Sequence, residues 1–174
     1  MAHIPQHPLP ETGDEIAILK TNHGNITLRF FHAMAPKTVE NFLTHAKNGY
    51  YNGIIFHRVI EGFMMQGGDP TGTGTGGESI WGKPFADECH PHAKNMRGSI
   101  SMANAGPGTN GSQFFINQND NTFLDGKHTV FGEIIEGMDI LDTICEQPVD
   151  RHDRPHEDVV IKGIEVQEYE EGKN

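Results

Sequence analysis

FHRVIEGFMMQ, residues 56–66, is the most informative stretch of this sequence. Its apolar residues fall into two short runs separated by Gly62, a pattern typical of short strands bounded by a turn residue. Alternation in the first run places Phe56, Arg58 and Ile60 on one face of a strand, so that a cation lies among large apolar side chains. The alternative is an ordinary surface arginine whose stem covers apolar area.

Similar short apolar runs recur on both sides of this stretch, each bounded by Gly, Asn, Asp or Pro. The runs predict strands at 54–59, 63–66, 99–103, 113–117, 129–135 and 159–166. Two further runs, at 15–20 and 26–31, flank the turn signal Asn22-His23-Gly24-Asn25 and therefore predict a β-hairpin.

Two segments predict helices instead. Residues 36–48 carry Val39, Phe42, Leu43 and Ala46 on one helical face, with Pro36 at the start. Residues 137–146 form a second, shorter candidate that ends before Pro148. Many short strands with only two helices favour a mostly β barrel or sandwich.

Length and composition support a single domain. The chain has 174 residues, with 21 Gly and 10 Pro providing many turns. We expect an irregular N-terminal arm at 1–13, one folded domain at 14–168 and a short polar tail at 169–174. One compact domain is consistent with a monomer.

The net charge of −11 disfavours nucleic acid, whose phosphates need a basic surface, and it also disfavours anionic membranes, so we expect neither as a partner. No apolar run is long enough for a membrane span, and the polar N-terminus lacks the pattern of a signal peptide. Two cysteines do not form a disulfide framework. We therefore expect a cytoplasmic protein with reduced thiols.

The sequence contains no convincing motif for a bound cofactor, a metal or a catalytic nucleophile. Residues 72–77 fit G-x-G-x-x-G, but Gly82 and Pro84 stand where the phosphate-binding helix has to begin, so a tight surface loop is the better interpretation. The segment 89–92, Cys-His-Pro-His, lacks the further ligands of a zinc site. Nothing fits a G-x-S-x-G nucleophile motif. We expect no cofactor and no metal.

Three clusters together carry a more specific signal. They are FHR at 56–58 with GFMMQGGD at 62–69, MANAGP at 102–107 leading into NGSQFF at 110–115, and FLDGKHTVFG at 123–132. In sequence and order they resemble the signature of the cyclophilins, and the resemblance extends from about Ile16 to Val166. It implies a closed antiparallel barrel of eight strands capped by two helices, and peptidyl-prolyl cis-trans isomerase activity that assists protein folding.

The resemblance also implies site residues. Arg58 matches the catalytic arginine of the family. The matching substrate-binding positions are Phe63, Met64, Gln66, Gly74, Thr75, Ala103, Asn104, Ala105, Gln113, Phe115, Phe123, Leu124 and His128. Gly74 and Thr75 belong to a neighbouring subsite loop, from which one residue is missing just before them.

One departure concerns the position before Leu124. Many cyclophilins have Trp there, whereas this chain has Phe123. A phenylalanine keeps the apolar bulk but lacks the indole N–H donor. Because that position matters for the cyclic peptide cyclosporin in the family, we expect weakened cyclosporin binding.

The implied partners are proline-containing peptides and unfolded or flexible protein segments. The alternative function belongs to another class. In it, the same pocket serves a proline-segment binding module, scaffold or chaperone, and turnover is incidental. An assay of turnover beside an assay of peptide binding distinguishes the two.

Overall fold

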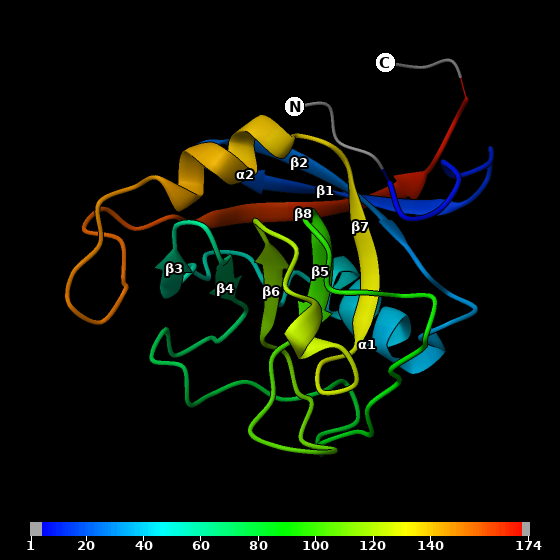
Figure 1. Cartoon of the computed structure of the whole chain (residues 1–174), viewed down its shortest axis with the longest axis horizontal. Helices are drawn as coiled ribbons and strands as arrows, with labels where there is room; N and C mark the ends of the chain where they lie inside the picture. The colour runs from blue at the N-terminus through cyan, green and yellow to red at the C-terminus, as the bar shows by residue number, and fades with distance from the viewer. Residues whose placement is uncertain (1–4, 172–174) are drawn as a thin grey trace.

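Eight antiparallel strands form one curled sheet within residues 5–171, the part of the chain that this computed structural model describes (Figure 1). The strands are β1 Glu15–Thr21, β2 Gly24–Phe30, β3 Arg58–Ile60, β4 Met64–Gly67, β5 Ser99–Met102, β6 Phe114–Asn117, β7 Val130–Glu136 and β8 Ile161–Glu168. Their order in the sheet is β3-β4-β6-β5-β7-β2-β1-β8. The mostly β architecture predicted from the short apolar runs is confirmed.

The predicted hairpin is present as β1 and β2, which pair from Ile16 opposite Arg29 to Thr21 opposite Gly24. Gly24 has a φ of +133°, a conformation that side-chain-bearing residues rarely adopt. The hydroxyl of Thr21 donates to the carbonyl of Gly24 at 2.7 Å and closes the turn.

Both predicted helices are also present, as α1 Pro36–Lys47 and α2 Met138–Cys145. Pro36 occupies the first turn of α1, where its missing N–H costs nothing. Helix α1 packs on β7 and β8, while α2 packs on β2, β3 and β4, so the two helices cover different parts of the curled sheet. A 3₁₀ turn, η1 Thr122–Leu124, lies within the connection between β6 and β7.

Aromatic rings form the centre of the core, between the sheet and α1. Phe42 on α1 lies 5.3 Å, ring centre to ring centre, from both Tyr51 and Phe114, and 5.4 Å from Phe131. All four side chains are inaccessible to solvent. These rings join the helix to β6 and β7, and burial of such large apolar area is the main stabilising contribution to a fold of this kind.

The sheet is a curled half-barrel and not the closed barrel that the resemblance implied. Strands β3 and β8 are its two edges, and one isolated bridge, between Ile55 and Val160, links the segments that precede them. The free edge of β3 faces a loop instead, since the amide of Val59 donates to the carbonyl of Asp153 at 2.7 Å. That loop separates β3 from β8 and prevents a continuous ladder.

The expected alternation of Phe56, Arg58 and Ile60 on one face is wrong at its first residue. Strand β3 begins only at Arg58, so the period of two does not extend back to Phe56. Phe56 is fully buried and packs on Phe114 at 5.9 Å, whereas Arg58 is exposed. The predicted strand at 54–59 is therefore shifted to 58–60.

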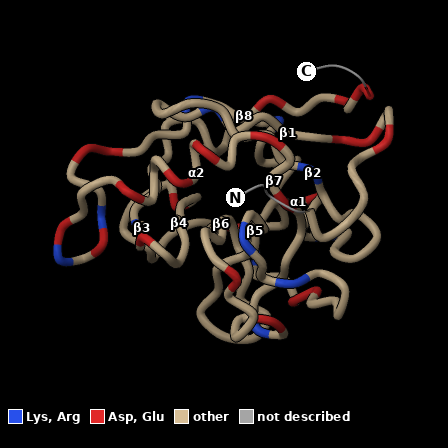
Figure 2. The backbone as a smooth tube through the Cα atoms, turned by 45° about the horizontal axis from the view of Figure 1, so that its top comes forward, with Lys and Arg blue, Asp and Glu red and all other residues tan. Residues whose placement is uncertain are grey.

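Residues 5–13 contain neither helix nor strand. The remainder of the expected arm, residues 1–4, and the second half of the expected tail, residues 172–174, lie outside the described residues. Asp and Glu positions are spread widely along the chain, in keeping with the net charge (Figure 2). Among the described helices, neither is long and apolar enough to cross a bilayer.

Candidate active site

Strand register brings three of the predicted site residues together. Arg58 on β3 lies opposite Gln66 on β4, and Gln66 in turn lies opposite Phe115 on β6. Met64 shares a face of β4 with Gln66, because side chains two residues apart point the same way. The intervening Met65 points into the core and is fully buried.

This row forms part of an apolar pocket of about 250 Å³. Its lining residues are Arg58, Phe63, Met64, Gln66, Ala103, Asn104, Phe115, Leu124 and His128. The residues come from β3, β4, β6 and η1, from the turn between β3 and β4, and from the loops that follow β5 and η1. Nine of the predicted site residues are thus gathered around one cavity, with the guanidinium of Arg58 among apolar side chains.

A chain of hydrogen bonds orients the polar members of the pocket. Gln113 Nε2 donates to the carbonyl of Gly76 at 2.9 Å, so its Oε1 is free to accept from Gln66 Nε2 at 3.0 Å. The Gln66 amide must then present Oε1 to Arg58, whose Nη1 lies 3.5 Å away. The orientation of two amides therefore decides where the guanidinium is held.

The loop that carries Gly76 is organised by a buried carboxylate. Asp69 accepts backbone N–H bonds from Thr71 at 2.8 Å, Gly74 at 2.7 Å and Gly76 at 3.1 Å. Burial by itself raises the pKa of Asp69, but these hydrogen bonds outweigh it and lower the pKa to about 2. A Cβ at Gly76 would collide with the Asp69 carboxylate, so only glycine fits there.

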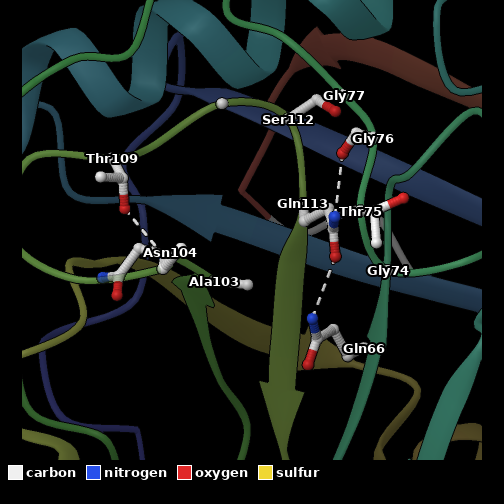
Figure 3. Close-up of a pocket in the computed structure, with 12 residues that line it drawn as sticks. Gln66, Gly74, Thr75, Gly76, Gly77, Ala103, Asn104, Thr109, Ser112 and Gln113 are labelled. Atoms are coloured by element: carbon white, nitrogen blue, oxygen red, sulfur yellow. Dashed lines mark hydrogen bonds between the residues drawn. The ribbon is translucent and has the colours of Figure 1, made fainter.

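The same loop forms one wall of a second depression, of about 390 Å³, which we call the glycine-loop cavity (Figure 3). Its lining includes the predicted residues Gly74, Thr75, Ala105 and Gln113. Gln66, Ala103 and Asn104 line both cavities and mark where they join.

Two further contacts hold the rim of the apolar pocket. Asn104 Nδ2 donates to the carbonyl of Lys127 at 2.8 Å, which ties the loop after β5 to the loop after η1. The ring of His128 hydrogen-bonds the Met102 carbonyl through Nδ1 at 2.9 Å and packs edge-on against Phe115. The side chain of Asn104 is engaged at both ends, because its Oδ1 also accepts from the amide of Gly106 at 3.2 Å, so the backbone of Asn104 is the part available to a ligand.

Phe123 lies beside the pocket rather than in its lining. Its ring stacks on Phe63, with centroids 6.0 Å apart and planes 20° from parallel, and it is 65% exposed. It therefore extends the apolar wall outward from Phe63.

Several residues at the site were not predicted from the sequence. Asp69 was quoted only as part of a motif, although it shapes the loop, and Gly76, Gly77, Thr109 and Ser112 also line the glycine-loop cavity. The spacing Asp-x-Thr with glycines following is the sequence signal for a carboxylate that caps a turn. Among the described residues, no group of three His, Cys, Asp or Glu side chains is placed to hold a metal.

The fold and the site together define a cyclophilin-type domain: a curled eight-stranded sheet with two helices, and an apolar pocket whose rim includes an arginine and a glutamine. The comparisons with known proteins agree. The family model of cyclophilin-type peptidyl-prolyl cis-trans isomerases matches residues 16–166. This chain belongs to that family and is a peptidyl-prolyl cis-trans isomerase.

Curated relatives include putative peptidyl-prolyl cis-trans isomerases of Staphylococcus saprophyticus, 48% identical, and Staphylococcus aureus, 47% identical. Each alignment covers 97% of this chain and all of the relative. A crystal structure of a cyclophilin-type isomerase from Cryptosporidium parvum superimposes with a TM-score of 0.86 at 42% identity, covering 88% of this chain and 98% of the other. The structure of that isomerase in the presence of the dipeptide Ala-Pro gives a TM-score of 0.85 at 43% identity.

Proposed function

We propose that the apolar pocket binds the proline ring of a substrate and that Arg58 is the catalytic residue. The observation that carries the proposal is the position of Arg58, a fixed cation on the rim of a pocket whose walls are Phe63, Met64, Phe115 and Leu124. A similar protein, the Cryptosporidium isomerase, was crystallised in the presence of the dipeptide Ala-Pro, which supports a proline-containing ligand for this pocket.

The chemistry required is a rotation. The barrier to turning an X-Pro bond is about 18–20 kcal/mol, because resonance gives the C–N bond partial double-bond character. Twisting the bond removes that resonance and leaves the lone pair on the proline nitrogen, where it accepts a hydrogen bond. A catalyst therefore has to bind the twisted amide better than either planar isomer.

Arg58 meets that requirement through its rigid, planar set of N–H donors. In this proposal it donates to the proline nitrogen or to the proline carbonyl of the twisted state. The apolar walls hold the ring, and the backbone of Asn104 holds the chain while the acyl side rotates. Gln66 Oε1, 3.5 Å from Arg58 Nη1, orients the guanidinium only weakly, which leaves its donors available to the substrate. An acceleration of about 10⁵ requires a barrier lower by about 7 kcal/mol.

The remaining positions have supporting roles. Gly74, Thr75, Ala105 and Gln113 form the adjoining subsite for residues next to the proline, and Ala103 and His128 complete the rim. Phe123 extends the wall that Phe63 begins.

The first experiment measures cis-trans exchange of an Ala-Pro-Phe peptide by NMR. We expect fast exchange with the wild type, loss of at least about a hundredfold in kcat/KM for Arg58→Ala, as for the removal of one transition-state donor, and no change for Arg151→Ala, an exposed arginine outside the apolar pocket. Arg58→Lys should be hardly more active than Arg58→Ala, because lysine lacks the planar donor fork of arginine. Full activity of Arg58→Lys would contradict the proposed geometry, and folded wild type without acceleration would favour the binding-module alternative.

The cellular role follows from the substrate. We propose that the clients are unfolded or flexible protein segments that contain proline, and that the protein assists their folding as a cytoplasmic monomer. Cys89 and Cys145 are both free thiols, as is usual in a reducing compartment. The isomerase domain is proposed to span residues 14–168, between an irregular arm and a short tail.

A further inference from the structure

A third cavity, of about 400 Å³, adjoins the apolar pocket on the side of Arg58. Its lining residues are His57, Arg58, Gln66, Gly72, Thr73, Gly74, Asp150, His152 and Arg154. Arg58 and Gln66 belong to both cavities. We call this space the arginine cavity, because its outer wall is the loop 148–158 and brings Arg154 to the same space as Arg58.

The loop 148–158 is held next to the start of the catalytic strand. The amide of Val59 donates to the carbonyl of Asp153 at 2.7 Å, and the amide of Asp150 donates to the carbonyl of Arg154 at 2.9 Å. Figure 1 shows this loop beside β3, and Figure 2 shows that it carries both basic and acidic residues. The position of Arg154 is thus fixed relative to Arg58 by backbone hydrogen bonds.

The acidic groups around the arginine cavity already have backbone donors. Asp150 Oδ1 accepts from the amides of His152 at 2.8 Å and Arg154 at 3.2 Å. Asp69 lies beneath the loop 71–76 with its carboxylate bonded to that loop. N–H groups engage both oxygens of Asp69 and Oδ1 of Asp150, so these oxygens do not depend on a guanidinium for a donor.

The two guanidiniums are held more loosely. Arg58 makes its bond to Gln66 at 3.5 Å, at the outer limit for a hydrogen bond. Arg154 pairs with Asp158 at 3.2 Å, and both of these side chains are about half exposed, so the pair is weak and exchanges readily. Burial lowers the pKa of His57, so this ring is neutral at pH 7 and adds no charge. Asp69 and Asp150 keep their negative charges, so what distinguishes Arg58 and Arg154 is that they are the cations of the cavity lining whose N–H donors can bind a ligand there.

We propose that the arginine cavity is a subsite for a carboxylate side chain, carried by a substrate residue one to three positions after the proline. The proposal rests on the proposed function of the apolar pocket. If the carbonyl of the substrate proline accepts a hydrogen bond from Arg58, the residues after the proline pass over the Arg58 side chain toward Arg154. A carboxylate there has two guanidiniums with donors in a planar fork, the geometry that binds carboxylates bidentately.

The effect acts at short range. The chain as a whole has a net charge of −11, which repels acidic peptides at a distance. Selectivity for an acidic residue thus has to come from contact with Arg58 and Arg154 rather than from the overall field. Because both side chains are solvent-exposed, the selectivity should decrease with added salt.

The test uses amidated and acetylated hexapeptides, so that no terminal carboxylate contributes. Ac-Ala-Ala-Pro-Ala-Glu-Ala-NH₂ is compared with the same peptide carrying Gln in place of Glu, and with a mirrored pair in which Glu or Gln precedes the proline by two positions. We expect kcat/KM to favour Glu over Gln about threefold to fivefold after the proline, the size of one exposed ion pair, mainly through KM. The mirrored pair should show no such preference.

The variants Arg154→Gln and Arg151→Gln remove the same charge from neighbouring positions of one loop. Arg151 does not line the cavity, so its variant should keep the preference for Glu, whereas Arg154→Gln should abolish it. Arg154→Glu should reverse it toward a peptide with Lys at that position, a result that a merely destabilised loop does not give. Exchange of the Gln peptide without any preference for Glu would overturn the subsite alone, while absence of exchange for every peptide would overturn the proposed function.

Discussion

Phe123 is the residue at which this chain departs from many cyclophilins, and the structure shows what it contacts. Its ring stacks on Phe63 while about two thirds of its surface stays in solvent. A larger aromatic ring fits at such a position without displacing the core. The indole N–H of a tryptophan would lie at the open edge of the pocket, where a large ligand passes.

We expect Phe123→Trp to bind cyclosporin about threefold to tenfold more tightly than the wild type, the contribution of one hydrogen bond. Isothermal titration of both proteins measures the difference. Exchange of the Ala-Pro-Phe peptide serves as the control and should change little, because tryptophan keeps the apolar wall that Phe123 extends from Phe63. Equal affinities for cyclosporin would show that the indole donor is unimportant here.

At the residue scale, the sequence identified the members of the site but not the forces that hold them. Arg58, Phe115 and Leu124 were recognised from the clusters in which they occur, and the structure places all three around one pocket. The amide chain from Gly76 through Gln113 to Gln66 joins residues 37 and 47 positions apart. Contacts over such separations depend on strand register, which short apolar runs do not specify.

At the scale of the elements, local signals predicted what local interactions determine. Helix α1 carries its own apolar face and its own Pro36, and its predicted start is the observed one. Strand β3 was placed four residues too early, because the apolar residues 54–56 serve another purpose: Phe56 is buried in the core, and this segment hydrogen-bonds residues 159–161 across the gap between the sheet edges. Tertiary contacts decided that boundary.

The loop 69–77 is an element held together by one ionised side chain, and this predicts its response to pH. The pKa of Asp69 is about 2 in the folded protein and near 3.9 in an unfolded chain, so folding favours the charged carboxylate. Its contribution, about 2 kcal/mol, is therefore complete above about pH 5 and is lost progressively as the pH falls through 4 toward 2 and below. Asp69→Asn removes this contribution at neutral pH.

Urea unfolding from pH 7 to pH 2 provides the measurement. The difference in unfolding free energy between wild type and Asp69→Asn should be constant from pH 7 to about pH 5 and should shrink at lower pH. Asp139→Asn, which changes an exposed carboxylate on α2, controls for the loss of charge. A difference that persists unchanged down to pH 2 would mean that the loop does not depend on the charge of Asp69.

At the scale of the whole molecule, the open edge between β3 and β8 raises the question of whether the core unfolds as one unit. The rings around Phe42 connect α1 with β6 and β7, and the same buried cluster includes Leu141, Ile144 and Cys145 on α2. A core shared by both helices and the sheet favours a single cooperative transition, although the sheet is not closed. The resemblance implied the fold but not the open edge. The edge of β3 is bonded by loop 148–158, and this loop carries no strand or helix signal in the sequence from which its position could be predicted.

The two free thiols allow a direct test of that cooperativity. Cys145 is 2% exposed and burial raises its thiol pKa to about 12, whereas Cys89 lies at the surface on the loop before β5. A thiol reagent attacks the thiolate, so Cys145 should react only from an opened molecule. In the variant Cys89→Ser, labelling of Cys145 in increasing urea should follow the loss of circular dichroism with the same midpoint. Labelling at clearly lower urea would instead show that α2 detaches from the sheet before the core unfolds, and that the uncovered edge of the half-barrel divides the molecule into two units of unequal stability.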